Sequence, residues 1–309
     1  MRRQFLVVVG AVAAVVVVSL VPVLVGAQAP TATAGATRWT PPHTPWGDPD
    51  LQGEWSAMTT TPLQRPTEGR EVITDPEELA RRFDADPALT GGGVGSYNAF
   101  WREYGEPVKG RTHLIVDPPD GRIPPLTPDA LKRPATPGDR ADGPEDRSLH
   151  ERCINWEVVS DSGVNVYYRI VQTPGYVAIN HFRLHDMRII PLDRRPHLPQ
   201  DVRQWVGDSR GRWEGNTLVV DITNFSDKTD YRGARGNLHV IERFTRVDAD
   251  TINYEAALED PTTWTRPWRF AKPLRKDTGG FYEYACHEGN HAMVGLLNGA
   301  RTQEKAAGK

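Results

Sequence analysis

The sequence predicts a mainly β protein, an antiparallel β-barrel or β-sandwich with few short helices. Short runs of alternating apolar and polar residues follow one another through the second half of the chain, and Gly, Pro, Asn and Asp separate them. Between these runs no long stretch has the period of a helix, which argues against parallel βαβ units. The 309 residues, 38% hydrophobic and 25% charged, suit a soluble globular protein.

The clearest strand pattern runs from 217 to 225, where apolar residues alternate with polar ones. The preceding segment 211–216 contains two glycines and an asparagine, which adopt positive φ at little cost. We therefore expect residues 210–213 to form a hairpin with residues 217–220.

A second hairpin is expected downstream, between the alternating runs 238–247 and 251–259. The connecting residues 248–250 form a three-residue loop, which places Phe244 opposite Tyr254. A four-residue loop would mix the two faces of the hairpin, so the three-residue register is preferred.

This register has one unusual consequence. One face becomes apolar and the other pairs opposite charges, Arg243 with Glu255 and His239 with Glu259. Glu242, however, falls on the apolar face. A carboxylate there is either a group for acid/base chemistry or half of a structural ion pair with a buried arginine such as Arg188 or Arg212.

The remaining elements are shorter. Further strands are expected at 112–116, 164–172, 176–180, 187–191, 264–274 and 281–286, and short helices at 76–83 and 96–104. The domain organisation predicted from composition is a signal peptide or N-terminal anchor at 1–29, a flexible linker at 30–49, a single β-rich domain at 50–300 with a long loop at 118–147, and a disordered tail at 301–309.

The N-terminus indicates export. Arg2 and Arg3 precede an apolar run from 5 to 25, and small residues suited to signal cleavage follow at 26–29. A Sec signal is favoured over a twin-arginine signal, and an uncleaved membrane anchor is the alternative. The protein is therefore expected to be periplasmic or secreted, with membrane contact only through an uncleaved N-terminal segment.

Two cysteines, Cys153 and Cys286, are expected to form a disulfide in an exported chain, two buried free thiols being the alternative. Neither the net charge of −3 nor any basic patch suggests nucleic acid as a partner.

Two resemblances add to this interpretation. Gly53-x-Trp55 resembles the opening motif of lipocalins, although an ordinary strand start with a core tryptophan explains it as well. Asp50-x-x-Gly53-x-Trp55 and the segments 114–122, 207–215 with 218–220, and 285–290 resemble an uncharacterised family of exported bacterial proteins. That resemblance implies export and no particular chemistry, since the family has no established activity.

His287-Glu288-Gly289-Asn290-His291 matches the H-E-x-x-H pattern, in which two histidines bind Zn²⁺ and the glutamate activates water. The pattern needs a helix, and Gly289 and Asn290 are poor helix formers. We therefore expect no metal cofactor, with a zinc site at His287 and His291 as the alternative.

The candidate catalytic residues are acid/base groups expected near a cavity: His185, Asp186, Glu242, His287 and Glu288. Candidate binding residues are Arg188, Arg212 and Asn290. A disulfide at Cys286 would hold His287 and Glu288 in a fixed place.

Two principal functions remain open, and both use a small-molecule pocket. The first is an acid/base enzyme of the isomerase, hydratase or hydrolase type, and the second is a non-catalytic binding or carrier protein; a zinc-dependent hydrolase is the third possibility. A free, desolvated Glu242 beside a histidine would favour the enzyme, and a Glu242 held in an ion pair would favour the carrier.

Overall fold

The computed structural model describes residues 39–67, 75, 78, 81, 105–133, 141–155, 159, 161 and 166–308. The expected N-terminal signal and most of the two helices expected at 76–83 and 96–104 lie outside these residues. From Trp39 onward the chain belongs to one compact unit.

The described chain is mostly antiparallel β-sheet. Its strands are β1 (Gly53–Ser56), β2 (Ile115–Asp117), β3 (Tyr167–Thr173), β4 (Tyr176–His181), β5 (Met187–Pro191), β6 (Asp208–Glu214), β7 (Thr217–Thr223), β8 (His239–Arg246), β9 (Thr251–Glu259) and β10 (Trp268–Lys276). Three 3₁₀ turns, η2 (Ala130–Lys132), η3 (Pro144–Asp146) and η4 (Arg183–His185), and one α-helix, α3 (His291–Ala306), complete the described elements.

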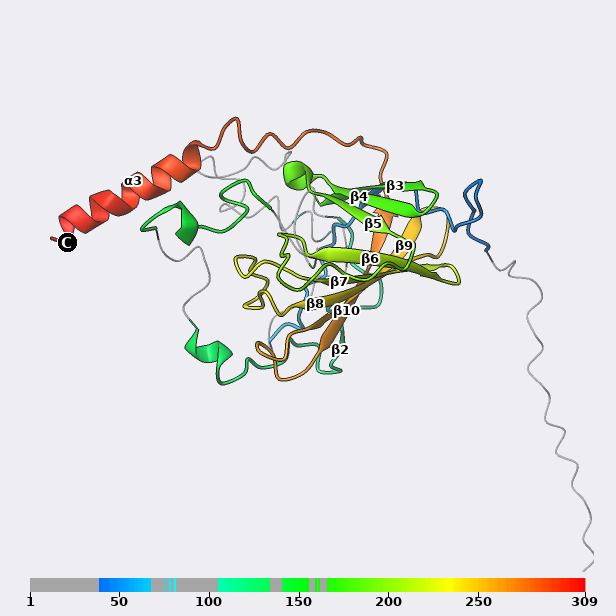
Figure 1. Ribbon diagram of the computed structural model, residues 1–309, viewed down its shortest axis with the longest axis horizontal. Coiled ribbons are helices and arrows are strands. Elements are labelled where there is room, and N and C mark those ends of the chain that lie inside the picture. The colour runs from blue at the N-terminus through cyan, green and yellow to red at the C-terminus, as the bar shows by residue number, and fades with distance from the viewer. Residues whose placement is uncertain are drawn as a thin grey trace, which may run out of the picture. The chain divides into compact units, whose positions relative to one another are not determined.

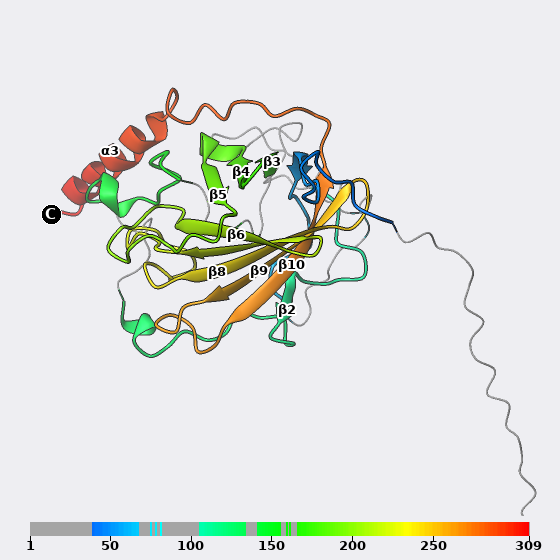
Figure 2. The same cartoon turned by 45° about the vertical axis from the view of Figure 1, so that its right-hand side comes forward.

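The strands form one sheet in the order β5-β4-β3-β1-β10-β9-β8-β7-β6, with β2 paired to β10 off this path. Figures 1 and 2 show the sheet curling so that β3, β4 and β5 stand over the part formed by β6 to β10. The result is a nearly closed barrel. Every neighbouring pair is antiparallel, so β5 and β6, the two ends of the path, run in the same direction.

We call the junction between β5 and β6 the seam. No backbone ladder joins these two described strands, and side chains close the junction instead. A Cβ atom added at Gly211 on β6 would stand 2.7 Å from Ile190 Cγ2 and 2.6 Å from Leu192 Cδ2. The absence of a side chain at Gly211 therefore lets the two strands approach closely.

The β8–β9 hairpin confirms the predicted register. Phe244 is the partner of Tyr254 and Arg243 the partner of Glu255. Glu242, at 2% exposure, is on the buried face as predicted. The β6–β7 hairpin is also confirmed, with Gly211 opposite Val220. Trp55 is fully buried and its indole N–H donates to the Leu51 carbonyl at 2.9 Å, the ordinary core role considered for it.

Four expectations differ from the structure. Residues 281–286 form no strand, because Phe281 packs against Arg169 and Phe182 instead of joining the sheet. Residues 301–306, expected in a disordered tail, belong to helix α3, which begins just after Asn290. Residues 39–49, expected in the linker, include a turn closed by a bridge between His43 and Pro49. Strand β6 begins at Asp208, two residues before the segment 210–213 that was expected in the hairpin.

The expected disulfide between Cys153 and Cys286 is present, with a Cα–Cα distance of 5.8 Å. It ties a segment before β3 to a segment after β10, so it closes a large loop that contains most of the barrel strands. Among the described helices none has the length and apolar character needed to cross a bilayer.

Candidate functional site: a buried polar cluster inside the barrel

Glu242 on β8 lies at the centre of a buried hydrogen-bonded triad. Nη1 of Arg188, from β5, donates to one carboxylate oxygen of Glu242 at 2.7 Å. The hydroxyl of Tyr254, from β9, donates to the other oxygen at 2.7 Å. The side chains of Arg188 and Glu242 are 3% and 2% exposed. The ion pair is thus enclosed in the barrel, and both carboxylate oxygens have donors.

Each partner of Glu242 is held in the protonated form. Burial lowers the pKa of the Arg188 guanidinium, and the Glu242 carboxylate more than reverses that effect, so the net pKa is raised. Burial raises the pKa of the Tyr254 hydroxyl well above its usual value, and the nearby Glu242 charge raises it further. Tyr254 therefore remains a hydrogen-bond donor, and Arg188 remains a cation.

His181 and Tyr168 lie on the same side of the sheet, on the neighbouring strands β4 and β3. Their rings are 4.5 Å apart in an edge-to-face arrangement. Burial, and secondarily the charge of Arg188, lower the pKa of His181 to about 3. The imidazole is therefore neutral across the physiological range and adds a polar group without adding charge.

Lys272 is the second buried cation on an inward-facing strand position. It is 1% exposed, and its ammonium donates to the Ala57 carbonyl at 2.8 Å. On β10 it stands directly opposite Tyr254 of β9. The buried cluster, as we use the term below, consists of Tyr168, His181, Arg188, Glu242, Tyr254 and Lys272.

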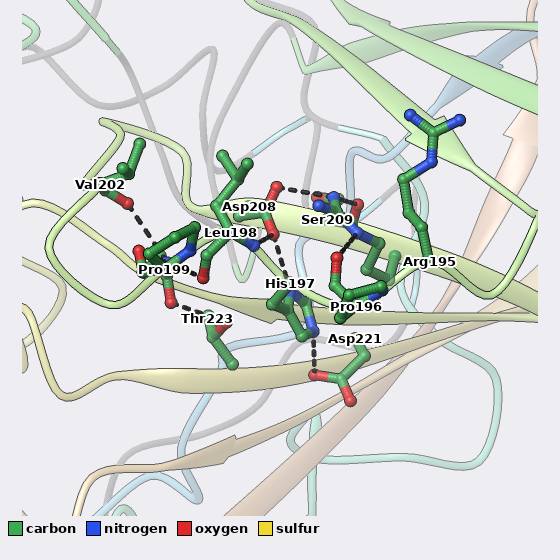
Figure 3. A network of polar contacts seen from close by, with 12 residues as sticks. Arg195, Pro196, His197, Leu198, Pro199, Val202, Asp208, Ser209, Asp221 and Thr223 are labelled. Atoms are coloured by element: carbon green, nitrogen blue, oxygen red, sulfur yellow. Dashed lines mark hydrogen bonds and ion pairs between the residues drawn. The ribbon is translucent and has the colours of Figure 1, made fainter.

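A second network lies on the outer side of the barrel, where the connection from β5 to β6 returns along the sheet (Figure 3). His197 Nδ1 is 2.8 Å from Asp208 Oδ2, and its Nε2 is 3.5 Å from Asp221 Oδ1. The Asn224 amide donates to the carbonyls of Leu198 and Pro199, both at 2.9 Å. These bonds hold the connection against β6 and β7.

His239 extends this outer network. Its Nε2 is 2.9 Å from Asp221 Oδ1. This hydrogen bond raises the pKa of His239, although burial opposes the change, and it lowers the pKa of Asp221. The network therefore acts as a structural clamp on this connection. Protonation of His239 at low pH turns its hydrogen bond with Asp221 into an ion pair.

The predicted acid/base residues are dispersed. His185 ends the turn η4, and Asp186 accepts a hydrogen bond from the Asn155 amide at 2.6 Å. His287 and Glu288 are exposed in the segment that precedes α3. None of these residues contributes either of the hydrogen bonds that Glu242 receives in the described structure.

The predicted binding residues also separate. Arg188 belongs to the buried cluster, whereas Arg212 lies on the outer face and pairs with Glu214 at 2.7 Å. Arg188, and not Arg212, is therefore the arginine that pairs with Glu242. The amide of Asn290 donates to the Glu151 carbonyl at 2.9 Å, beside the disulfide.

The H-E-x-x-H pattern does not lie on one helix. His287 precedes α3 and His291 begins it. Across the described residues no three His, Cys, Asp or Glu side chains gather as metal ligands. Trp264 and Trp268, from the segment expected as a strand at 264–274, are buried and pack edge to face with ring centres 5.5 Å apart.

Sequence reasoning missed four members of the cluster, Tyr168, His181, Tyr254 and Lys272, although alternation carried a signal for each. Lys272 continues the inward series Trp268, Phe270 and Leu274, and His181 continues the inward series of β4. The predicted register places Tyr254 on the correct face, but it does not show that the Tyr254 hydroxyl donates a hydrogen bond to Glu242. The missed residues are those whose polar groups interrupt an apolar face.

The fold and site together define a nearly closed antiparallel barrel with a buried ionic cluster. No protein-family model matches the chain, and no curated protein matches it. A solved structure of a mutant of the fluorescent protein UnaG matches with a TM-score of 0.24 and 16% sequence identity, over 42% of this chain and 86% of that chain. At this level of similarity no ligand or activity is transferred, and the fold class rests on the strand pairing described above.

Proposed function

We propose that the protein is a non-catalytic binding or carrier protein that holds a small molecule inside its barrel. The observation that supports this proposal best is the state of Glu242. Arg188 and Tyr254 occupy its two oxygens, so the carboxylate has no oxygen left without a donor for proton exchange with a substrate. The geometry favours recognition over acid/base catalysis.

The energetics of the cluster support a role in recognition. A buried ion pair is often no more stabilising than well-packed apolar residues of similar size, because two charges lose their hydration. The inward strand positions next to Glu242 are apolar: Val220 and Ala256 are its cross-strand partners, and Val240 and Phe244 flank it on β8. A polar group at this depth is suited to orienting the polar end of a largely apolar ligand.

The size of the barrel is compatible with a small ligand. Barrels of about 8 strands enclose an interior that side chains fill or that holds one small molecule. The path of the nearly closed barrel here contains β1 and β3 to β10, so its circumference is slightly larger.

We also infer that the protein works outside the cytoplasm, in the periplasm or the medium. The N-terminal arginines and apolar run support export. The Cys153–Cys286 disulfide is compatible with an oxidising compartment.

The binding proposal is tested with the neutral fluorophore phenylnaphthylamine, whose emission rises in apolar surroundings. Ala256 is fully buried opposite Glu242, whereas its neighbour Ala257 lies on the other face of β9. We expect saturable one-to-one binding to the unmodified protein and to Ala257→Leu, and at least tenfold weaker binding to Ala256→Leu.

Circular dichroism shows whether both variants remain folded, because added core volume typically costs about 1–3 kcal/mol. The binding proposal fails if the folded unmodified protein produces no saturable signal, or if Ala256→Leu binds as well as Ala257→Leu.

A further inference from the structure

We propose that the ligand is a neutral molecule that presents a carbonyl oxygen to the seam, an inference that rests on the proposed binding function. In the described part of the chain, three polar atoms at inward-facing positions of the two seam strands have no hydrogen-bond partner. They are Arg188 Nε on β5, and Ser209 Oγ and Trp213 Nε1 on β6.

The strand pairing places these residues on the inside. On β6, Ser209 is opposite Ile222 and Trp213 is opposite Leu218, two residues of the fully buried face of β7. Arg188 reaches Glu242 from the same interior. Arg188 and Ser209 are 4% and 6% exposed, so bulk water does not satisfy them.

The three residues also lie close together along the seam. A Cβ atom at Gly211 of β6 would contact both Ile190 of β5 and Leu192, which follows β5, and the two strands run in the same direction. Arg188 precedes this contact on β5, as Ser209 does on β6, and Trp213 follows it by two residues.

The chemistry of the three atoms defines the ligand. An arginine Nε–H and an indole N–H can only donate, and a serine hydroxyl can donate or accept. Buried polar atoms nearly always have partners in native proteins. Three such groups on two adjoining strands therefore indicate a missing acceptor, which the ligand supplies.

The buried cluster contains a second cation, Lys272, which donates to the Ala57 carbonyl, but the local pairing at Arg188 favours a neutral acceptor. The Arg188 guanidinium is already paired with Glu242 at 2.7 Å. A ligand carboxylate at Arg188 Nε would bring a second anion close to Glu242 in a buried region, where like charges repel strongly. A ketone, ester or amide carbonyl accepts the same hydrogen bonds without this repulsion.

The test compares three probes of equal chain length: octane, methyl hexyl ketone and octanoate. Nitrogen–proton correlation NMR spectra of the purified protein report the Arg188 Nε–H and Trp213 Nε1–H signals, assigned with Arg188→Lys and Trp213→Phe. We expect the ketone to shift the Arg188 signal saturably and to bind more tightly than octanoate, and we expect octane to leave that signal in place.

Ser209→Ala supplies a second readout, because it removes one donor without adding volume. It should weaken ketone binding about three- to tenfold, the effect of one hydrogen bond, and leave octane binding unchanged. Ser226→Ala, at a serine whose hydroxyl accepts from the backbone N–H of Lys228, is the matched control and should change neither.

The outcomes separate the two proposals. If phenylnaphthylamine binds but the ketone moves neither side-chain signal, the carbonyl inference is wrong and the binding function stands. Tighter binding of octanoate than of the ketone also overturns the inference. If no probe binds, the proposed function fails and the inference fails with it.

Discussion

Glu242 is the residue that holds the buried polar groups of the barrel together. Its two oxygens receive donors from Arg188 and Tyr254, which come from strands on either side of it in the chain. Removing one member leaves the other charge buried without compensation, which is more costly than removing both. The ion pair therefore behaves as one unit.

A double-mutant cycle tests this coupling. We expect Arg188→Met and Glu242→Leu each to lower the free energy of unfolding by about 3–5 kcal/mol, because each leaves a buried charge unpaired. The double variant should lose much less than the sum of the two. The exposed pair Arg212 and Glu214 is the matched control and should show no measurable coupling. Additive losses at Arg188 and Glu242, measured by denaturant unfolding, would contradict this account.

His181 links stability to pH at the same site. Its pKa is about 3 in the folded barrel and 6.5 in the ordinary reference state. Between these values the unfolded chain binds more protons, so stability is lost as the pH falls through this window. The contribution is at most about 1.4 kcal/mol per pH unit. We expect His181→Phe to flatten the dependence of the unfolding free energy on pH over this range.

His239 serves as a control, because its contribution to stability changes with pH in the opposite direction to that of His181. Hydrogen bonding to Asp221 raises its pKa, so its contribution to stability is present at low pH and is lost as the pH rises through the folded-state value. His239→Asn should therefore leave the acid-side loss intact. If His181→Phe shows the same pH dependence as the unmodified protein, the buried imidazole is not the source of the stability loss at low pH.

At the scale of elements, the seam differs from every other strand junction in the barrel. The other neighbours along the path are joined by backbone ladders, whereas β5 and β6 meet through Ile190, Leu192 and Gly211. The volume of the side chains at this junction therefore sets the distance between β5 and β6.

Gly211→Ala measures this packing. The new methyl group would meet Leu192 Cδ2 at 2.6 Å, so we expect a loss of about 1–3 kcal/mol in the free energy of unfolding. The double variant Gly211→Ala with Leu192→Ala should be less destabilised than the sum of the single changes. Gly289→Ala is the control, since no atom lies within 4 Å of the added carbon. Equal effects at Gly211 and Gly289 would contradict a tightly packed seam.

The elements that could be predicted from sequence are those whose structure depends on neighbouring residues in the chain. The loop at 248–250 determines the β8–β9 register, and alternation then places Glu242 inside. The strand expected at 281–286 is not formed because two of its aromatic residues, Phe281 and Tyr284, pack on Phe182, a contact distant in sequence. Helix α3 was missed because Gly289 and Asn290 were taken to break a helix, whereas Asn290 immediately precedes one.

At the scale of the molecule, barrel closure assembles the site. Arg188 and Glu242 are 54 residues apart, and closure of the sheet brings β5 within reach of β8. Sequence alone named Arg188 and Arg212 as equal partners for Glu242, because the choice depends on which face of a distant strand turns inward. The outer clamp of His197, Asp208 and Asp221 was not predicted for the same reason.

The most direct measurement is native mass spectrometry of the protein purified from its exported compartment, with Ala256→Leu and Ala257→Leu alongside. We predict one bound small molecule per chain on the unmodified protein and on Ala257→Leu, and none on Ala256→Leu. Its mass would identify the ligand and show directly whether it is neutral. Adducts that persist on folded Ala256→Leu, or a chain that carries no small molecule and cannot be loaded with phenylnaphthylamine, would contradict binding inside the barrel.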